Sequence, residues 1–198
     1  MSQDGKLDEW IKIFGDVYSS DPQTVNSANE AIQEKFENDQ AFLLDNCARI
    51  LMFEDSEDER IMKAKTLSTV LLSQILNVHN NLEELRKNLV QNQELTDQIK
   101  NALKQNVFSA NDSIRKLSAQ CYSYLFSILT KYWQDGIDDI IKSFNNTNFL
   151  PYGYIGLLSI MREIINLVQV VDGLIPDFNE QFNQTIIFCI DILSKDKS

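Results

Sequence analysis

Apolar residues recur at intervals of three and four along almost the whole chain, and this period constrains the fold more than any other feature. The clearest example lies between Ser113 and Trp133, where Ile114, Leu117 and Cys121 are followed by further apolar residues at the same intervals. Residues three or four apart share one face of an α-helix, so each such stretch predicts a helix with one buried side. With six Gly and three Pro, the chain has too few turn-forming residues for a many-stranded β fold. The sequence therefore predicts an all-α protein.

Capping residues indicate where several of these helices begin. Asp21 followed by Pro22 is typical of a helix start, because the aspartate accepts backbone N–H groups and proline needs no partner there. Asp39 is expected to cap the next helix in the same way. Ser56 with Glu59 three residues later predicts a capping box.

The predicted helices form pairs, and the first helices of successive pairs begin near residues 22, 56, 112 and 149. HEAT-like repeats of about 40 residues have this layout, with a polar insertion lengthening the second unit here. We therefore predict a single α-solenoid array over residues 1–198, built from about four antiparallel helix pairs in a right-handed superhelix. An irregular helical bundle is the alternative architecture. The four predicted units are 7–54, 56–110, 112–146 and 149–196.

The acidic composition limits the classes of partner. The formal net charge is -11 and no cluster of Lys and Arg is present, which argues against nucleic-acid binding. An acidic surface suits basic protein partners, or solubility alone. The most apolar segment, 152–171, carries Arg162 and Glu163 at its centre, so we expect a buried helix rather than a membrane span. The first ten residues lack the basic and apolar regions of a secretory signal, and a soluble intracellular protein is expected.

No group of residues in the sequence has the spacing of an active site or a metal site. The single histidine, His79, has no neighbour for a catalytic triad. The three cysteines, Cys47, Cys121 and Cys189, are far apart and lie in apolar helical stretches, which favours buried unpaired thiols over metal ligands. Gly-rich phosphate loops and hydrolase motifs are absent from the sequence. We therefore expect a protein that is not an enzyme and needs no cofactor.

Particular residues resemble a known family. Residues 116–121, Lys-Leu-Ser-Ala-Gln-Cys, followed by 133–141, Trp-Gln-Asp-Gly-Ile-Asp-Asp-Ile-Ile, resemble the third HEAT repeat of importin-β-type karyopherins. In that family a Ser-Ala-x-Cys stretch leads to a Trp-Pro-x-x-Ile-Pro-x-Leu turn. Residues 42–51 are similar to the second helix of the family's first repeat, and the order of parts agrees over nearly the whole chain. The chain departs from the pattern at Gln134 and Asp138, where prolines are usual.

The resemblance implies the N-terminal four repeats of a nuclear transport receptor, found in the cytoplasm and the nucleus. In that family the second helices of these repeats line the concave face and bind the Ran GTPase in its GTP form. FG nucleoporins, import cargo or a cargo adaptor would bind regions beyond this chain, which would be a fragment or a shortened relative. The alternative is a HEAT-repeat scaffold or trafficking adaptor with an unrelated protein partner, since a fold alone does not determine function.

The candidate partner-binding residues are charged positions on the predicted second helices. Asp45 and Arg49 are four apart on an otherwise apolar helix, so they share its outward face. Similar spacings recur on two later helices, and in a solenoid equivalent faces form one extended surface. A solvated face without a partner is the alternative interpretation. The candidate residues are Asp45, Arg49, Asp97, Lys100, Lys104, Asp138, Asp139 and Lys142.

Overall fold

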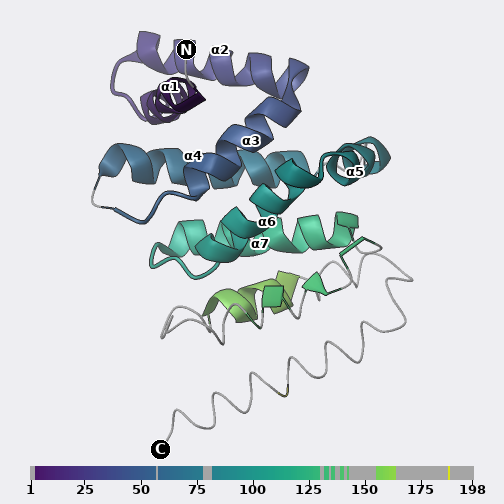
Figure 1. Cartoon of the computed structure of the whole chain (residues 1–198). Coiled ribbons are helices and arrows are strands. Elements are labelled where there is room, and N and C mark those ends of the chain that lie inside the picture. Colours follow the sequence, from purple (N-terminus) through teal and green to yellow (C-terminus); the bar gives the residue numbers. More distant parts are fainter. Residues whose placement is uncertain are drawn as a thin grey trace, which may run out of the picture.

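The computed structural model describes residues 3–56, 58–77, 82–129, 132–133, 135–136, 139–140, 142, 155–163 and 187. α-Helix is the only regular secondary structure in these residues, so the all-α prediction is confirmed for them (Figure 1). Residues 155–163 are helical. The helices before them are α1 Gln3–Asp16, α2 Pro22–Asn38, α3 Gln40–Leu51, α4 Glu59–Leu76, α5 Leu82–Gln91, α6 Gln93–Asn106 and α7 Asp112–Leu129.

Local capping explains where α2 and α3 begin. The Asp21 carboxylate accepts hydrogen bonds from the backbone N–H groups of Gln23 and Thr24, and Pro22 is the first helical residue. The Asp39 carboxylate accepts from the N–H of Phe42 at 3.2 Å. Both predicted caps are confirmed.

The predicted capping box at Ser56 is wrong. The N-cap of α4 is Asp58, whose carboxylate accepts from the N–H of Arg60 at 2.9 Å. The Ser56 hydroxyl instead accepts from the Asp58 N–H, which stabilises the turn before the helix. Glu59 forms an ion pair with Lys63 one turn later, at 2.7 Å. Asp58 lies closer to the first turn than Ser56, and this position decides which oxygen caps the helix.

Two pairs of consecutive helices are separated by one capping residue each. Only Asp39 lies between α2 and α3, and only Asn92 lies between α5 and α6. The Asn92 side chain accepts from the N–H of Leu95, which matches the role of Asp39. α5 forms within the polar stretch of the sequence because Leu85 and Leu89 supply it with a buried side.

Helices α3–α4 and α6–α7 repeat one layout. They begin at residues 40 and 59 and at residues 93 and 112, so both offsets are 53 residues (93 − 40 and 112 − 59), and α4 and α7 each have 18 residues. α1 packs on α4 and α4 packs on α7, while α3 packs on α6. Figure 1 shows α4 above α7, with α3 and α6 lying across them. Five of the described helices therefore form two layers, one of α1, α4 and α7 and the other of α3 and α6. α2 packs on α1 and α3, and α5 packs on α6 and α7.

The core lies between these layers, and α4 packs against α1 and α7 in its own layer and against α3 of the other. Leu72 and Ile75 of α4 and Leu125 of α7 are completely buried. Cys47 and Cys121 are also buried and free, as expected. Burial raises the pKa of both thiols, and the proximity of Cys47 adds to the increase for Cys121. Cys189 and His79 lie outside the described residues.

The helix at 155–163 continues the layer of α4 and α7. The Ser123 hydroxyl of α7 donates to the carbonyl oxygen of Ile160 at 3.3 Å, and Leu157 and Ile160 are completely buried. Gly156 lies against the backbone of Val107 at the end of α6. No helix within the described residues combines the length and apolar character required to cross a bilayer.

Candidate protein-binding face

The predicted partner-binding residues that the structure describes lie on α3, on α6 and on the short segment that follows α7. Gln98 and Asn101 of α6 line a pocket together with Arg49 of α3, which shows that the two helices contribute to a common surface. We call this surface the α3–α6 face. It consists of Asp45, Arg49, Asp97, Gln98, Lys100, Asn101, Lys104 and Asp139.

Asp45 and Arg49 form an ion pair within α3. The Arg49 Nε atom lies 2.9 Å from an Asp45 carboxylate oxygen, and both side chains are about one-third exposed. The Nε atom is buried and does not donate a well-directed hydrogen bond, so the contact is ionic and the angle is poor. Among the described residues the Arg49 guanidinium has no other partner.

Lys100 is held against the core side of the face rather than projecting from it. Its ammonium group lies 3.3 Å from the Asp97 carboxylate and 4.8 Å from the centre of the Trp133 ring. The side chain is only 14 % exposed. A cation over an aromatic ring is attracted by the ring's electron-rich face, and here it fixes Lys100 in place.

Lys104 connects α6 to the segment after α7. Its ammonium group donates to the Asp139 carboxylate at 2.9 Å. Lys142 is exposed, and Asp138 lies outside the described residues. The predicted residues on α3 and on α6 therefore form ion pairs within their own helices, and Lys104 of α6 pairs with Asp139. Their role in partner binding stays a prediction.

A pocket of about 480 Å³ opens where α1, α3 and α6 meet. The Oε1 atom of Gln98 in its wall is buried and accepts no hydrogen bond from the described residues. Met52 is 47 % exposed and forms one edge of the pocket. Sequence reasoning missed this pocket because its walls come from three helices. The lining residues are Leu7, Ala48, Arg49, Met52, Phe53, Gln98 and Asn101.

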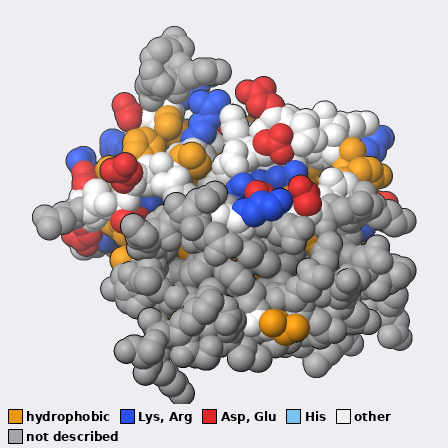
Figure 2. Space-filling model, turned by 60° about the horizontal axis from the view of Figure 1, so that its bottom comes forward, with side chains coloured by type: hydrophobic (Ala, Val, Ile, Leu, Met, Phe, Trp, Pro, Cys, Tyr) orange, Lys and Arg blue, Asp and Glu red, His pale blue; other side chains and the backbone are white. Residues whose placement is uncertain are grey.

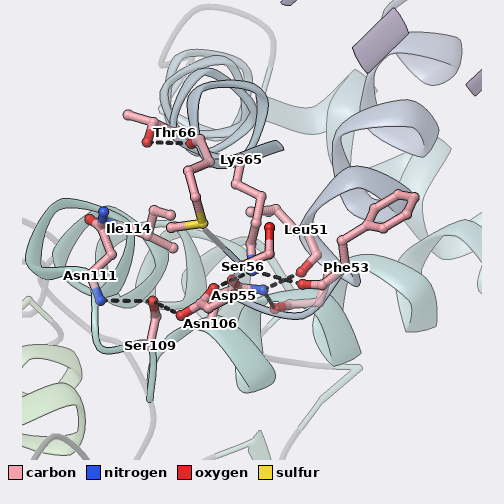
Figure 3. Close-up of polar contacts among 12 residues, drawn as sticks. Leu51, Phe53, Asp55, Ser56, Lys65, Thr66, Asn106, Ser109, Asn111 and Ile114 are labelled. Atoms are coloured by element: carbon pink, nitrogen blue, oxygen red, sulfur yellow. Dashed lines mark hydrogen bonds and ion pairs between the residues drawn. The ribbon is translucent and has the colours of Figure 1, made fainter. Parts of the chain in front are cut away.

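A partly buried polar network joins the end of α3 to the end of α6 (Figure 3). The Lys65 ammonium group of α4 donates to the Phe53 carbonyl oxygen at 2.8 Å and to the Asp55 carboxylate at 2.5 Å. The other Asp55 oxygen accepts from the Ser109 hydroxyl at 2.6 Å. Asn106 of α6 donates to the Leu51 carbonyl oxygen of α3 at 2.6 Å. The turns after α3 and α6 are thus tied to one another.

The electrostatics of Asp55 follow from these contacts. Burial alone raises its pKa, but hydrogen bonds from Lys65 and Ser109, the charge of Lys65 and the Ala110 N–H together hold the pKa below its usual value. Lys65 is a signal that sequence reasoning could have used. It lies between Ala64 and Ser68 on the buried side of α4, where a lysine needs an acceptor.

Charges of both signs lie side by side among the coloured residues of the face drawn in Figure 2. Figure 2 shows Lys and Arg side chains next to Asp and Glu side chains, without a broad surface of one sign among the coloured residues. The ion pairs of the α3–α6 face are part of this pattern. In the part of the chain that the structure describes, no group of three or more His, Cys, Asp or Glu side chains is arranged to hold a metal ion.

No family model, no curated protein and no solved structure matches this chain.

Proposed function

We propose that the chain is a protein-binding HEAT-type solenoid and forms part of an importin-β-type nuclear transport receptor whose partner is Ran in its GTP form. The observation that carries the architecture is the repetition of α3–α4 by α6–α7 at a constant offset, with α3 packed on α6 and α4 packed on α7. Stacked helix pairs that contact only their neighbours are the defining feature of a solenoid. The choice of Ran comes from the family resemblance of residues 116–121 and 133–141.

The α3–α6 face has properties suited to a protein partner. Ion pairs such as Lys104–Asp139 hold its charged groups in fixed positions, which lowers the entropy lost when a partner binds. The polar network of Lys65, Asp55 and Ser109 holds the turn after α3 against the turn after α6. A GTPase has switch segments that are ordered by the γ-phosphate and released after hydrolysis. A rigid face can therefore distinguish the GTP form from the GDP form by shape.

The direct test is binding of the purified chain to Ran loaded with a non-hydrolysable GTP analogue or with GDP. We expect binding to the GTP form and binding at least about tenfold weaker to the GDP form. Lys104→Glu should weaken binding to the GTP form by about tenfold, mainly through slower association at low salt, because it reverses a charge on the face. The control is Lys116→Glu on α7, which also breaks an ion pair with an aspartate, Asp112, but lies outside the face.

A second variant separates loss of the ion pair from loss of a partner contact. Lys104→Asp combined with Asp139→Lys keeps the internal pair and exchanges the two charges. If this double variant is folded and binds Ran-GTP as well as the parent chain across a salt series, the α3–α6 face is not the Ran surface. A folded parent chain that binds neither nucleotide form would instead favour the HEAT scaffold or trafficking adaptor.

A further inference from the structure

The pocket between α1, α3 and α6 has walls of two chemical kinds. Its volume of about 480 Å³ is in the range of sites that hold a small molecule or a few side chains. Leu7, Ala48, Met52 and Phe53 provide apolar walls. Arg49, Gln98 and Asn101 provide the polar wall. A ligand that fits must therefore present both an apolar group and hydrogen-bonding groups.

Two buried polar atoms in this wall lack hydrogen-bond partners among the described residues. Oε1 of Gln98 accepts no hydrogen bond, and Nε of Arg49 contacts the Asp45 carboxylate at 2.9 Å without a well-directed hydrogen bond. Burying such atoms without partners is unfavourable, and native proteins retain few of them. The Gln98 amide can rotate about its terminal bond, so a bound molecule could supply the hydrogen bond that Oε1 lacks.

The charge of the wall indicates what such a molecule carries. Asp45 contacts the Arg49 guanidinium at Nε only, and neither Nη group donates a hydrogen bond to a described residue. Guanidinium groups bind carboxylates through two parallel N–H donors, and such charge-assisted bonds are stronger than neutral ones. The two Nη groups of this guanidinium therefore offer donors for an acidic group beside its contact with Asp45.

We propose that this pocket binds an extended peptide segment of a protein partner in which a large apolar side chain is next to a carboxylate. The apolar side chain contacts Leu7, Met52 and Phe53, and the carboxylate accepts hydrogen bonds from Arg49. A backbone N–H of the segment donates to Gln98. The inference rests on the proposed protein-binding function and adds the chemistry of the segment that is recognised.

The test uses fluorescence anisotropy with the full chain and a capped, labelled hexapeptide, Ser-Glu-Phe-Glu-Ser-Gly. We expect saturable binding, and a loss of about tenfold or more when the phenylalanine is replaced by alanine or both glutamates by lysine. Arg49→Gln and Met52→Glu should each weaken binding by about tenfold. The matched control is Arg60→Gln, since Arg60 at the start of α4 is 81 % exposed and lies outside this pocket. Circular dichroism establishes that each variant is folded.

The proposal is overturned if the lysine peptide binds as tightly as the glutamate peptide, or if Arg49→Gln binds like the parent chain. It is also overturned if no saturable binding occurs up to about 1 mM peptide. Ran binding without peptide binding would reject the pocket assignment alone. Peptide binding without Ran binding would reject the choice of Ran and leave the pocket assignment in place.

Discussion

Lys65 is the most deeply buried charged residue in the described part of the chain. Its side chain is 1 % exposed, and its ammonium group depends on the Asp55 carboxylate and the Phe53 carbonyl oxygen. The partners differ in their access to water, because the Asp55 side chain is about one-third exposed. Asp55 also accepts a hydrogen bond from Ser109, so it keeps a partner if the lysine is lost.

This asymmetry predicts unequal effects of removing either partner. Asp55→Asn leaves the buried ammonium group without its counter-ion, and we expect the free energy of unfolding to fall by about 3 kcal/mol. Lys65→Met should cost only about 1 kcal/mol, because methionine fits the apolar surroundings and Asp55 retains Ser109 and water. Urea denaturation of both variants and the double variant measures the difference. Equal losses, or a larger loss for Lys65→Met, would contradict this account of the pair.

At the scale of elements, the position of the 155–163 helix depends on close approach to the end of α6. A Cβ atom added at Gly156 would lie 2.0 Å from the carbonyl oxygen of Val107, a backbone atom that cannot rotate away. The two segments must therefore separate if residue 156 carries a side chain. Because α7 contacts the same helix through Ser123 and Ile160, the separation would also disturb the core beside α7.

Gly156→Ala should consequently lower the free energy of unfolding by about 2 kcal/mol, through overpacking at this contact. Gly15→Ala is the control, since a Cβ atom at Gly15 of α1 meets nothing within 4 Å. Alanine is the better helix former, so this second change should be neutral or stabilise the protein by up to about 1 kcal/mol. Thermal and urea denaturation compare the two. A Gly156→Ala variant as stable as the parent would show that the 155–163 helix does not pack as described.

At the scale of the whole molecule, acid should destabilise the fold through its partnered aspartates. Hydrogen bonds to Asp21, Asp58 and Asp112 lower the pKa of each, with Thr24, Arg60 and Lys116 respectively as the main donors. The pKa of Asp55 is also lowered. A carboxyl group whose pKa is lower in the folded state stabilises the protein above its unfolded pKa, and this contribution is lost as the pH falls through the folded pKa.

We therefore expect Tm to decrease when the pH is lowered below about 4, the region of the unfolded aspartate pKa. Protonation also relieves repulsion within a chain of net charge -11, and this opposing effect acts mainly above pH 4. Comparing the parent chain with Asp55→Asn isolates one contribution, since the variant lacks that titrating group. Its Tm should depend less steeply on pH between about 5 and 2.5 than that of the parent. A steeper dependence in the variant would contradict the assigned direction of the Asp55 pKa.

The sequence alone determined the features that depend on neighbours along the chain. Apolar residues at intervals of three and four predicted the helices, and Asp21 and Asp39 predicted two of their starts, because a capping side chain bonds residues two or three positions away. The prediction that Ser56 caps α4 is wrong even though it concerns near neighbours, since Asp58 offers an oxygen closer to the first turn. Local spacing also predicts the candidate charges on α3 and α6.

Only the tertiary structure decided which residues those charges contact. Lys104 pairs with Asp139 from 35 residues away, and Lys65 reaches Asp55 across the turn before α4, so no local pattern specifies either contact. The pocket beside Arg49 likewise depends on three helices meeting. Such contacts follow from the packing of whole helices, in which many weak apolar contacts act together, so they become visible only once the layers are assembled.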